Sequence, residues 1–340
     1  MVATDLFLPI RRGGKVRLKE EDLMVEQLPL FLSLSRPDEI SWRYRAEIVG
    51  PDGTSIMVNG EEVDGELLVE TPVAVTQLPW EFPKIGAESL SLMISYLIPN
   101  TEGESFFNPS PWAAKVKVED MELSMEAGEI SSSPKQTKRK DSFHELKLRT
   151  GFYNPTFHFQ NPLFVNYSKE VTGRSTWFSV ESCGKAIALA SPSPITLEHD
   201  LAHLRAESRE EIVVLRGKNW KEVKPYRISW SMKNPPVKLD VKPVFNLSLY
   251  TLEPSSVVPM LMKFEEGKLK LTLVNMSDNA VMANFRVAAR VTQAKVLYPA
   301  EEEIVPEFNV VKVPIRRWGL VHLELSLRPL LEGLLKRFIL

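Results

Sequence analysis

Apolar and polar residues alternate along most of the chain, and this pattern predicts β-strands. In the first hundred residues, segments 31–35 (FLSLS) and 42–49 (WRYRAEIV) alternate with a period of two. Turn residues follow them at Gly50-Pro51-Asp52-Gly53, Asn59-Gly60 and Asp64-Gly65. Strands this close together pair antiparallel, because a parallel pair needs a crossover of about a dozen residues. We predict an N-terminal β-sandwich domain over residues 1–130, in which 90–98 (LSLMISYLI) is a long buried strand.

The same alternation resumes after residue 142. The segments that follow it are 143–150, 176–181, 186–190, 212–217, 226–232, 237–252, 268–276, 281–298, 309–315 and 319–327. We predict a middle β-sandwich over residues 143–242 and a C-terminal β-sandwich over residues 243–340. Segment 131–142 (SSSPKQTKRKDS) is polar and basic and lacks large apolar side chains, so we expect a solvated linker or loop. A basic patch for an acidic partner is the alternative.

Two segments have apolar residues at helical spacing. Leu197, Leu201 and Leu204 share one face of a helix predicted near 195–211. A second helical stripe lies within 329–340 and comprises Leu330, Leu331, Leu334, Leu335 and Phe338. This stripe packs against its own domain or docks to another chain to form an oligomer. The predicted fold class is all-β, with two or three antiparallel β-sandwich domains, one inserted helix and a short C-terminal helix.

Composition excludes several classes of protein. The chain has 340 residues with 42 Lys and Arg against 44 Asp and Glu, and this balance argues against a nucleic-acid partner. Its single cysteine, Cys183, excludes an internal disulfide framework and a cysteine-based zinc finger. No stretch approaches ~20 apolar residues, and the N-terminal apolar run precedes its basic residues, the reverse of a secretory signal. We therefore expect a cytoplasmic protein with no membrane partner.

A short motif of aromatic residue, Asn and Pro recurs three times. Its copies are Phe106-Phe107-Asn108-Pro109, Phe152-Tyr153-Asn154-Pro155 and Phe159-Gln160-Asn161-Pro162. Asn-Pro initiates turns, and the preceding aromatic side chain can anchor such a turn to a core. Alternatively, these aromatic residues line a sugar-binding cleft.

Tryptophan supplies the candidate carbohydrate-binding residues. Exposed indoles form flat platforms for the apolar faces of sugar rings. Trp80 and Trp112 lie beside prolines in segments predicted to be loops, where such a platform would be placed.

The candidate metal site is His199-Asp200-Leu201-Ala202-His203. Two histidines four residues apart on a helix face one side and can hold zinc, with the intervening acid as general base. The standard motif has Glu between the histidines, and a surface helix that happens to carry His199 and His203 is the alternative. Apart from this zinc, we expect no cofactor. No nucleophile elbow and no glycine-rich phosphate loop occur in the sequence.

A series of short segments lies within residues 243–327. They are Phe245-Asn246-Leu247, Ser255-Ser256-Val257, the turn Asn275-Met276-Ser277-Asp278, the step from Val291 to Ala294, and the strand from Val321 to Leu325. With these segments, residues 243–327 resemble the C-terminal β-domains of family 38 glycoside hydrolases, the α-mannosidases. In that family the nucleophilic Asp and the zinc ligands lie in an N-terminal α/β domain. The first hundred residues here predict strands instead, so no catalytic residue is carried over.

The resemblance implies a non-catalytic protein that recognises carbohydrate or serves as an accessory subunit of a glycoside-processing assembly. Its expected partner is a carbohydrate or a catalytic partner chain. A structural or scaffolding oligomer is one alternative. The other is a hydrolase, either a glycosidase or a zinc-dependent enzyme built around His199 and His203.

Overall fold

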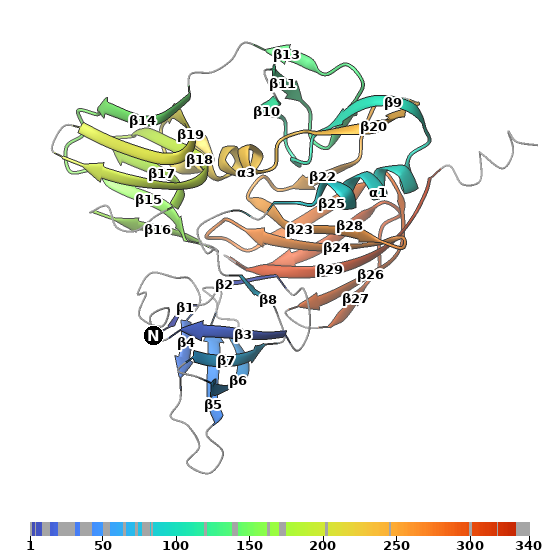
Figure 1. Ribbon diagram of the computed structural model, residues 1–340, viewed down its shortest axis with the longest axis horizontal. Helices are drawn as coiled ribbons and strands as arrows, with labels where there is room; N and C mark the ends of the chain where they lie inside the picture. The colour runs from blue at the N-terminus through green and yellow to red at the C-terminus, as the bar shows by residue number, and fades with distance from the viewer. Residues whose placement is uncertain are drawn as a thin grey trace, which may run out of the picture.

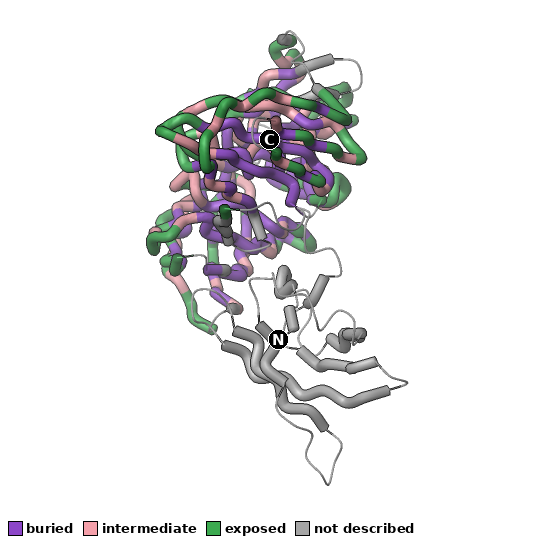
Figure 2. The backbone as a smooth tube through the Cα atoms, turned by 90° about the vertical axis from the view of Figure 1, so that its left-hand side faces the viewer, coloured by how far each residue is buried: buried purple, intermediate pink, exposed green. Residues whose placement is uncertain are grey.

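The structure is a computed structural model. It describes the backbone of the strands within 2–76, and in addition residues 82, 84–118, 121–137, 142–161, 164–169, 175–200, 203–244, 246–298, 301–317 and 319–330. Antiparallel sheets dominate these residues and confirm the predicted all-β class (Figure 1). Figure 2 shows buried residues concentrated in the interior and exposed residues toward the outside of the described part of the chain.

The N-terminal strands form a six-stranded sheet and a two-stranded sheet. The larger sheet has the order β1-β4-β5-β6-β7-β3, and the smaller sheet pairs β2 with β8. Their bounds are β1 Val2–Ala3, β2 Asp5–Leu8, β3 Gly14–Lys19, β4 Phe31–Leu34, β5 Arg43–Val49, β6 Ser55–Val63, β7 Glu66–Thr71 and β8 Ala74–Thr76. The strands predicted at 31–35 and 42–49 are confirmed as β4 and β5, which pair antiparallel as expected.

A six-stranded antiparallel sheet with the order β14-β19-β18-β17-β15-β16 makes up the middle of the chain. Its strands are β14 Ser142–Arg149, β15 Thr156–Asn161, β16 Phe164–Ser168, β17 Ser175–Ser182, β18 Lys185–His199 and β19 His203–Gly217. One face of the sheet buries a separate apolar core that includes Phe157, Phe178, Leu189 and Leu204. The strands predicted at 143–150, 176–181, 186–190 and 212–217 are confirmed.

The helix predicted near 195–211 is wrong, because this segment is the β18–β19 hairpin. Leu197 and Leu204 are both buried, but they reach the same core from opposite strands of the hairpin. A spacing of seven residues suits either one helical face or two paired strands, which explains the error. Asp200 closes the turn, since its side chain accepts a hydrogen bond from the backbone N–H of His203 at 2.8 Å.

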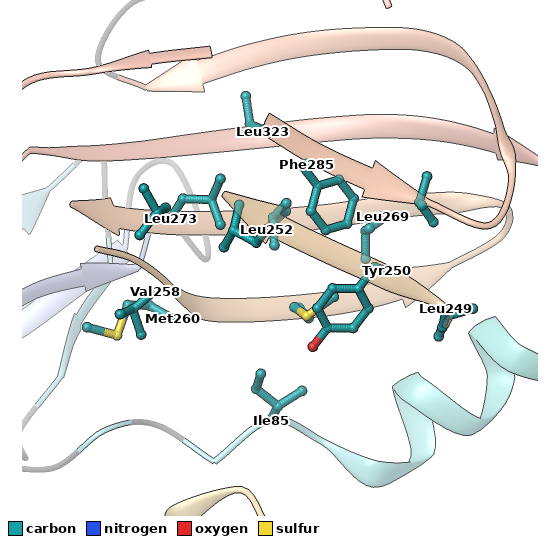
Figure 3. Packing of buried hydrophobic residues seen from close by; sticks show 14 of the residues in the cluster. Ile85, Leu249, Tyr250, Leu252, Val258, Met260, Leu269, Leu273, Phe285 and Leu323 are labelled. Atoms are coloured by element: carbon teal, nitrogen blue, oxygen red, sulfur yellow. The ribbon is translucent and has the colours of Figure 1, made fainter. Parts of the chain in front are cut away.

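Two sheets form the C-terminal sandwich. One has the order β22-β25-β28 and the other the order β23-β24-β29-β26-β27. Their strands are β22 Tyr250–Glu253, β23 Val257–Glu265, β24 Lys268–Asn275, β25 Val281–Val287, β26 Arg290–Tyr298, β27 Glu302–Ile304, β28 Val310–Ile315 and β29 Leu320–Arg328. Phe285, Leu273 and Leu323 pack between the sheets, and Tyr250 lies beside Phe285 (Figure 3).

The segment 90–98, predicted as a strand, is instead part of helix α1 (Ala87–Leu97). Leu90, Met93, Ile94 and Leu97 are its buried residues, and their spacing of three and four residues follows one helical face. The helix lies against β23 of the sandwich (Figure 1). Additional apolar residues on its exposed face obscure this period in the sequence.

The strand predicted at 226–232 is also wrong, because these residues belong to helix α3 (Pro225–Lys233). Pro225 occupies the first helical position, where a missing N–H costs nothing. Tyr226, Ser229 and Trp230 are buried at helical spacing. A short helix, α2 (Trp220–Val223), precedes it.

Smaller sheets connect these parts. One has the order β20-β9-β12-β21 and the other the order β10-β11-β13. Their strands are β9 Asn100–Phe107, β10 Ala114–Val118, β11 Met121–Met125, β12 Glu129–Ser131, β13 Lys135–Thr137, β20 Val237–Pro243 and β21 Leu247–Ser248. The apolar core of the C-terminal sandwich includes Phe107 and Ile130 as well as Trp230 and Leu239, so it extends across residue 130. In the predicted linker, residues 135–137 form β13, and 138–141 lie outside the described residues.

None of the helices among the described residues is long and apolar enough to cross a membrane. The predicted C-terminal helical stripe lies outside the described residues except for Leu330, which is exposed.

Candidate functional site

A hollow of about 720 Å³ opens at one end of the middle sheet. We call it the Tyr153 hollow. The residues that contribute its main chemical groups are Tyr153, Asn154, His158, Lys169, Glu181 and Lys218. They come from the turn before β15, from β15 itself, from the residue after β16, from the end of β17 and from the segment after β19.

Tyr153 is the aromatic side chain of this hollow and is 90% exposed. It belongs to the second copy of the aromatic-Asn-Pro motif, in which Asn154 takes a left-handed conformation with φ 44°. Asn is among the residues that tolerate this conformation best. Ser182 holds the turn by donating a hydrogen bond from Oγ to the carbonyl of Tyr153 at 2.9 Å. The backbone is therefore fixed while the ring projects outward.

Lys169 also braces this turn. Its ammonium donates to Thr156 Oγ1 at 2.9 Å and to the carbonyl of Asn154 at 3.4 Å. The side-chain amide of Asn154 and the ammonium of Lys218 make no hydrogen bond or ion pair with any described residue. These two groups remain available to hydrogen-bond a ligand.

The carboxylate of Glu181 has a structural role at the base of the hollow. Its Oε1 accepts hydrogen bonds from Ser179 Oγ at 2.8 Å and from the backbone N–H of Trp220 at 2.6 Å. His158 Nδ1 lies 3.5 Å from the same oxygen. Burial lowers the pKa of His158 and outweighs the opposing effect of Glu181, while Lys221 lowers it further. The imidazole is thus mainly neutral at pH 7.

Trp112, predicted to be an exposed sugar platform, is only 6% exposed. Its indole Nε1 donates to Ser231 Oγ at 2.9 Å, and its ring meets Trp230 edge-on with centroids 5.3 Å apart. The guanidinium of Arg227 lies over the ring at 4.5 Å from its centroid. Carbohydrate binding at Trp112 stays a prediction, and any ligand there would meet Arg227 first. Trp80, the other predicted platform, lies outside the described residues.

His199 and His203 are placed differently from the predicted arrangement on one helical face. His199 pairs with Leu204 across the hairpin, so the alternation of side chains puts His199 and His203 on opposite faces of the sheet. His199 packs edge-on against Phe157 at 5.3 Å, whereas His203 Nδ1 lies 3.2 Å from Asp200 Oδ1. The prediction that His199 and His203 lie on one face of a helix is wrong. Zinc binding stays a prediction, which metal analysis of the protein and of His203→Ala would test. In the described part of the chain, no three His, Cys, Asp or Glu side chains are grouped to hold a metal ion.

Sequence reasoning did not single out Tyr153, Lys169 or Lys218 as site residues. Only the aromatic-Asn-Pro motif signalled one of them, since a sugar-binding cleft was one interpretation of its aromatic residues. No local sequence pattern marks Lys169 or Lys218 as a site residue, because each lies in a segment distant in sequence from the motif at 152–155.

Comparison with known proteins adds little to this geometry. No protein-family model matches the sequence, and no curated protein matches it. The crystal structure of an alpha-mannosidase from Enterococcus faecalis V583 aligns with 86% of this chain and 43% of its own, with 8% sequence identity and a TM-score of 0.38. This chain therefore spans less than half the length of that protein. The likeness concerns the fold alone and assigns neither family nor activity to this chain.

Proposed function

We propose that this protein binds carbohydrate, and that the Tyr153 hollow is its binding site. The observation that carries the proposal is a tyrosine ring, 90% exposed, held at a hollow lined by hydrogen-bonding side chains. An aromatic face packs against the apolar C–H face of a pyranose, and fixed polar groups then orient its hydroxyls. Asn154 and Lys218 supply such groups, and the Ser182 and Lys169 hydrogen bonds pre-organise the turn.

The lining favours binding over hydrolysis. Glycoside hydrolysis by the common mechanisms needs two carboxyl groups on opposite sides of the scissile bond. Glu181 is the one carboxylate among the described residues that line the hollow, and two hydrogen bonds already hold it. We therefore extend the proposal to a non-catalytic, accessory role. The native mass of the protein from its own source, with any co-purifying chains identified, tests that extension.

Affinity gel electrophoresis against a panel of immobilised polysaccharides, mannans included, tests the binding proposal. We expect at least one polysaccharide to retard the protein. Tyr153→Phe should keep the retardation because it keeps the ring, and Tyr153→Ala should weaken binding about tenfold or more, or about 1.4 kcal/mol. Phe308→Ala is the matched control, since Phe308 is also an exposed aromatic residue but lies away from the hollow.

Two results would contradict the proposal. One is the absence of retardation by every polysaccharide in the panel. The other is a Tyr153→Ala protein that binds as well as the unmodified chain.

A further inference from the structure

A second cleft, of about 680 Å³, lies between helix α3 and the start of the C-terminal sandwich. We call it the Arg227 cleft. Its lining includes Trp112 and Arg227 on one side and Glu253, Ser255, Met282 and Asn284 on the other. It shares no lining residue with the Tyr153 hollow.

The indole of Trp112 gives this cleft a rigid wall. Its Nε1 bond to Ser231 Oγ and its edge-on contact with Trp230 fix the plane of the ring. A second hydrogen bond at 2.9 Å joins Ser231 Oγ to Ser110 Oγ, so the supporting group is itself held. The guanidinium of Arg227 covers one face of the ring.

Arg227 is a half-buried cation without a counter-ion among the described residues. No carboxylate of the described residues lies within ion-pair distance of its guanidinium, and its Nε is buried with no hydrogen-bond partner there. Burial lowers the pKa of Arg227, although an arginine stays charged at neutral pH. A partly desolvated charge with an unsatisfied N–H is costly, and a bound anion relieves that cost.

Two other charged groups at the cleft also affect the binding of an anion. The ammonium of Lys224 hydrogen-bonds Ser255 Oγ, which places a second positive charge at the edge of the cleft. Burial, together with the charge of Arg227, lowers the pKa of Lys224. Glu253 is the opposing charge in the lining, and Asn284 pairs with it across β22 and β25. The negative charge of Glu253 opposes a bound anion, so its removal is a test of anion binding in this cleft.

We infer that the Arg227 cleft binds a small anionic ligand through the guanidinium of Arg227, which is held in place by the Trp112 ring. The planar fork of a guanidinium matches the oxygens of a carboxylate or a phosphate and donates two parallel hydrogen bonds. The contact with the Trp112 ring holds the guanidinium at the lining of the cleft and uses none of its N–H groups as hydrogen-bond donors. This inference is independent of the proposed carbohydrate site.

The test uses the full chain and two probe anions, inorganic phosphate and D-glucuronate. Isothermal titration calorimetry at constant ionic strength measures the binding of each anion. D-glucose serves as the uncharged reference and chloride as the simple-ion reference. We expect saturable binding of phosphate or glucuronate, and the tighter one identifies the anionic group as a phosphate or a carboxylate. Arg227→Gln should weaken this binding about tenfold or more, as expected for the loss of a charged hydrogen bond.

Two further variants separate binding from folding. Arg227→Lys keeps the charge but loses the fork, so it should bind more weakly than the unmodified chain even if Arg227→Gln fails to fold. Glu253→Gln lies in the same cleft and should bind as tightly or more tightly, because it removes a negative charge. The inference is overturned if both anions behave like chloride, if Arg227→Lys or a folded Arg227→Gln binds unchanged, or if Glu253→Gln abolishes binding.

Discussion

Thr272 Oγ1 and His322 Nδ1 lie 2.8 Å apart on the paired strands β24 and β29, on the face of the sheet opposite to Leu273 and Leu323. His322 is only 2% exposed. Burial lowers its pKa to about 4, with a further lowering from Lys270 and smaller opposing effects from Glu324 and from a backbone hydrogen bond to Leu271. A neutral histidine thus forms part of the folded core.

This arrangement predicts that the protein loses stability in mild acid. The folded pKa of about 4 lies below the unfolded value of 6.5, so the unfolded chain binds the extra proton between these pH values. The contribution of His322 is complete above pH 6.5 and is lost as the pH falls toward 4. The difference corresponds to about 3 kcal/mol. Denaturant unfolding at several pH values measures it.

His322→Gln is the control for this prediction, because glutamine keeps a hydrogen-bonding group but does not titrate. The variant should lose less stability than the unmodified protein between pH 7 and pH 4. Other titrating groups, including His158, are common to both proteins and cancel in the comparison. An identical loss in the two proteins would mean that His322 is not the group responsible.

Gly128 and Gly151 provide a second prediction, about close backbone packing. Both have positive φ, of 58° and 62°. A Cβ on Gly128 would lie 2.2 Å from the carbonyl oxygen of Tyr250, whereas one on Gly151 would meet nothing within 4 Å. Gly151→Ala should therefore cost about 1 kcal/mol, the strain of the left-handed conformation alone.

Gly128→Ala should cost clearly more, about 3 kcal/mol or above, because the backbone of β22 would have to move. Thermal unfolding of both variants, monitored by circular dichroism, measures the difference. Equal melting temperatures for the two variants would contradict the close approach of Gly128 to Tyr250.

Asn108 and Asn154 occupy the same position of the recurring motif, yet they should respond differently to substitution. Asn108 is fully buried; it donates to the carbonyls of Glu126 at 2.7 Å and Trp112 at 3.2 Å, and accepts from the N–H of Ser110 at 3.0 Å. Asn108→Ala leaves these groups unsatisfied and should cost about 3 kcal/mol.

The exposed Asn154 holds no such network, so Asn154→Ala should cost no more than about 1 kcal/mol, mainly from its left-handed backbone. Urea unfolding of the two variants gives the comparison. A larger loss for Asn154→Ala than for Asn108→Ala would show that the buried turn at Asn108 is not the more important of the two.

Much of the strand content could be predicted from the sequence, because a half-buried strand must alternate apolar and polar side chains whatever it packs against. The sequences of strands β4, β5, β14 and β24 follow this pattern directly, whereas β17 is buried on both faces over most of its length. Helix α1 was mistaken for a strand because Leu92 and Tyr96, at 61% and 47% exposure, are apolar residues on its outer face. Their presence hides the helical period.

The candidate site could be predicted only in part. The motif Phe152-Tyr153-Asn154-Pro155 predicts a turn, and the structure has one there. The hollow itself requires Lys169, Glu181 and Lys218, which the order of strands in the middle sheet brings together from separate segments. No local sequence pattern could predict that these three residues line one hollow.

The sequence by itself determined the all-β class and the antiparallel pairing of neighbouring strands, since these depend on side-chain periodicity. The turn predicted at Asn59-Gly60 is wrong, because both residues lie within β6. Tertiary structure alone decided which aromatic residues are buried. At the same motif position Phe107 lies in the core, while Tyr153 is exposed at the hollow. The physical reason is that burial depends on what a neighbouring layer covers, and the C-terminal sandwich packs over Phe107 but not over Tyr153.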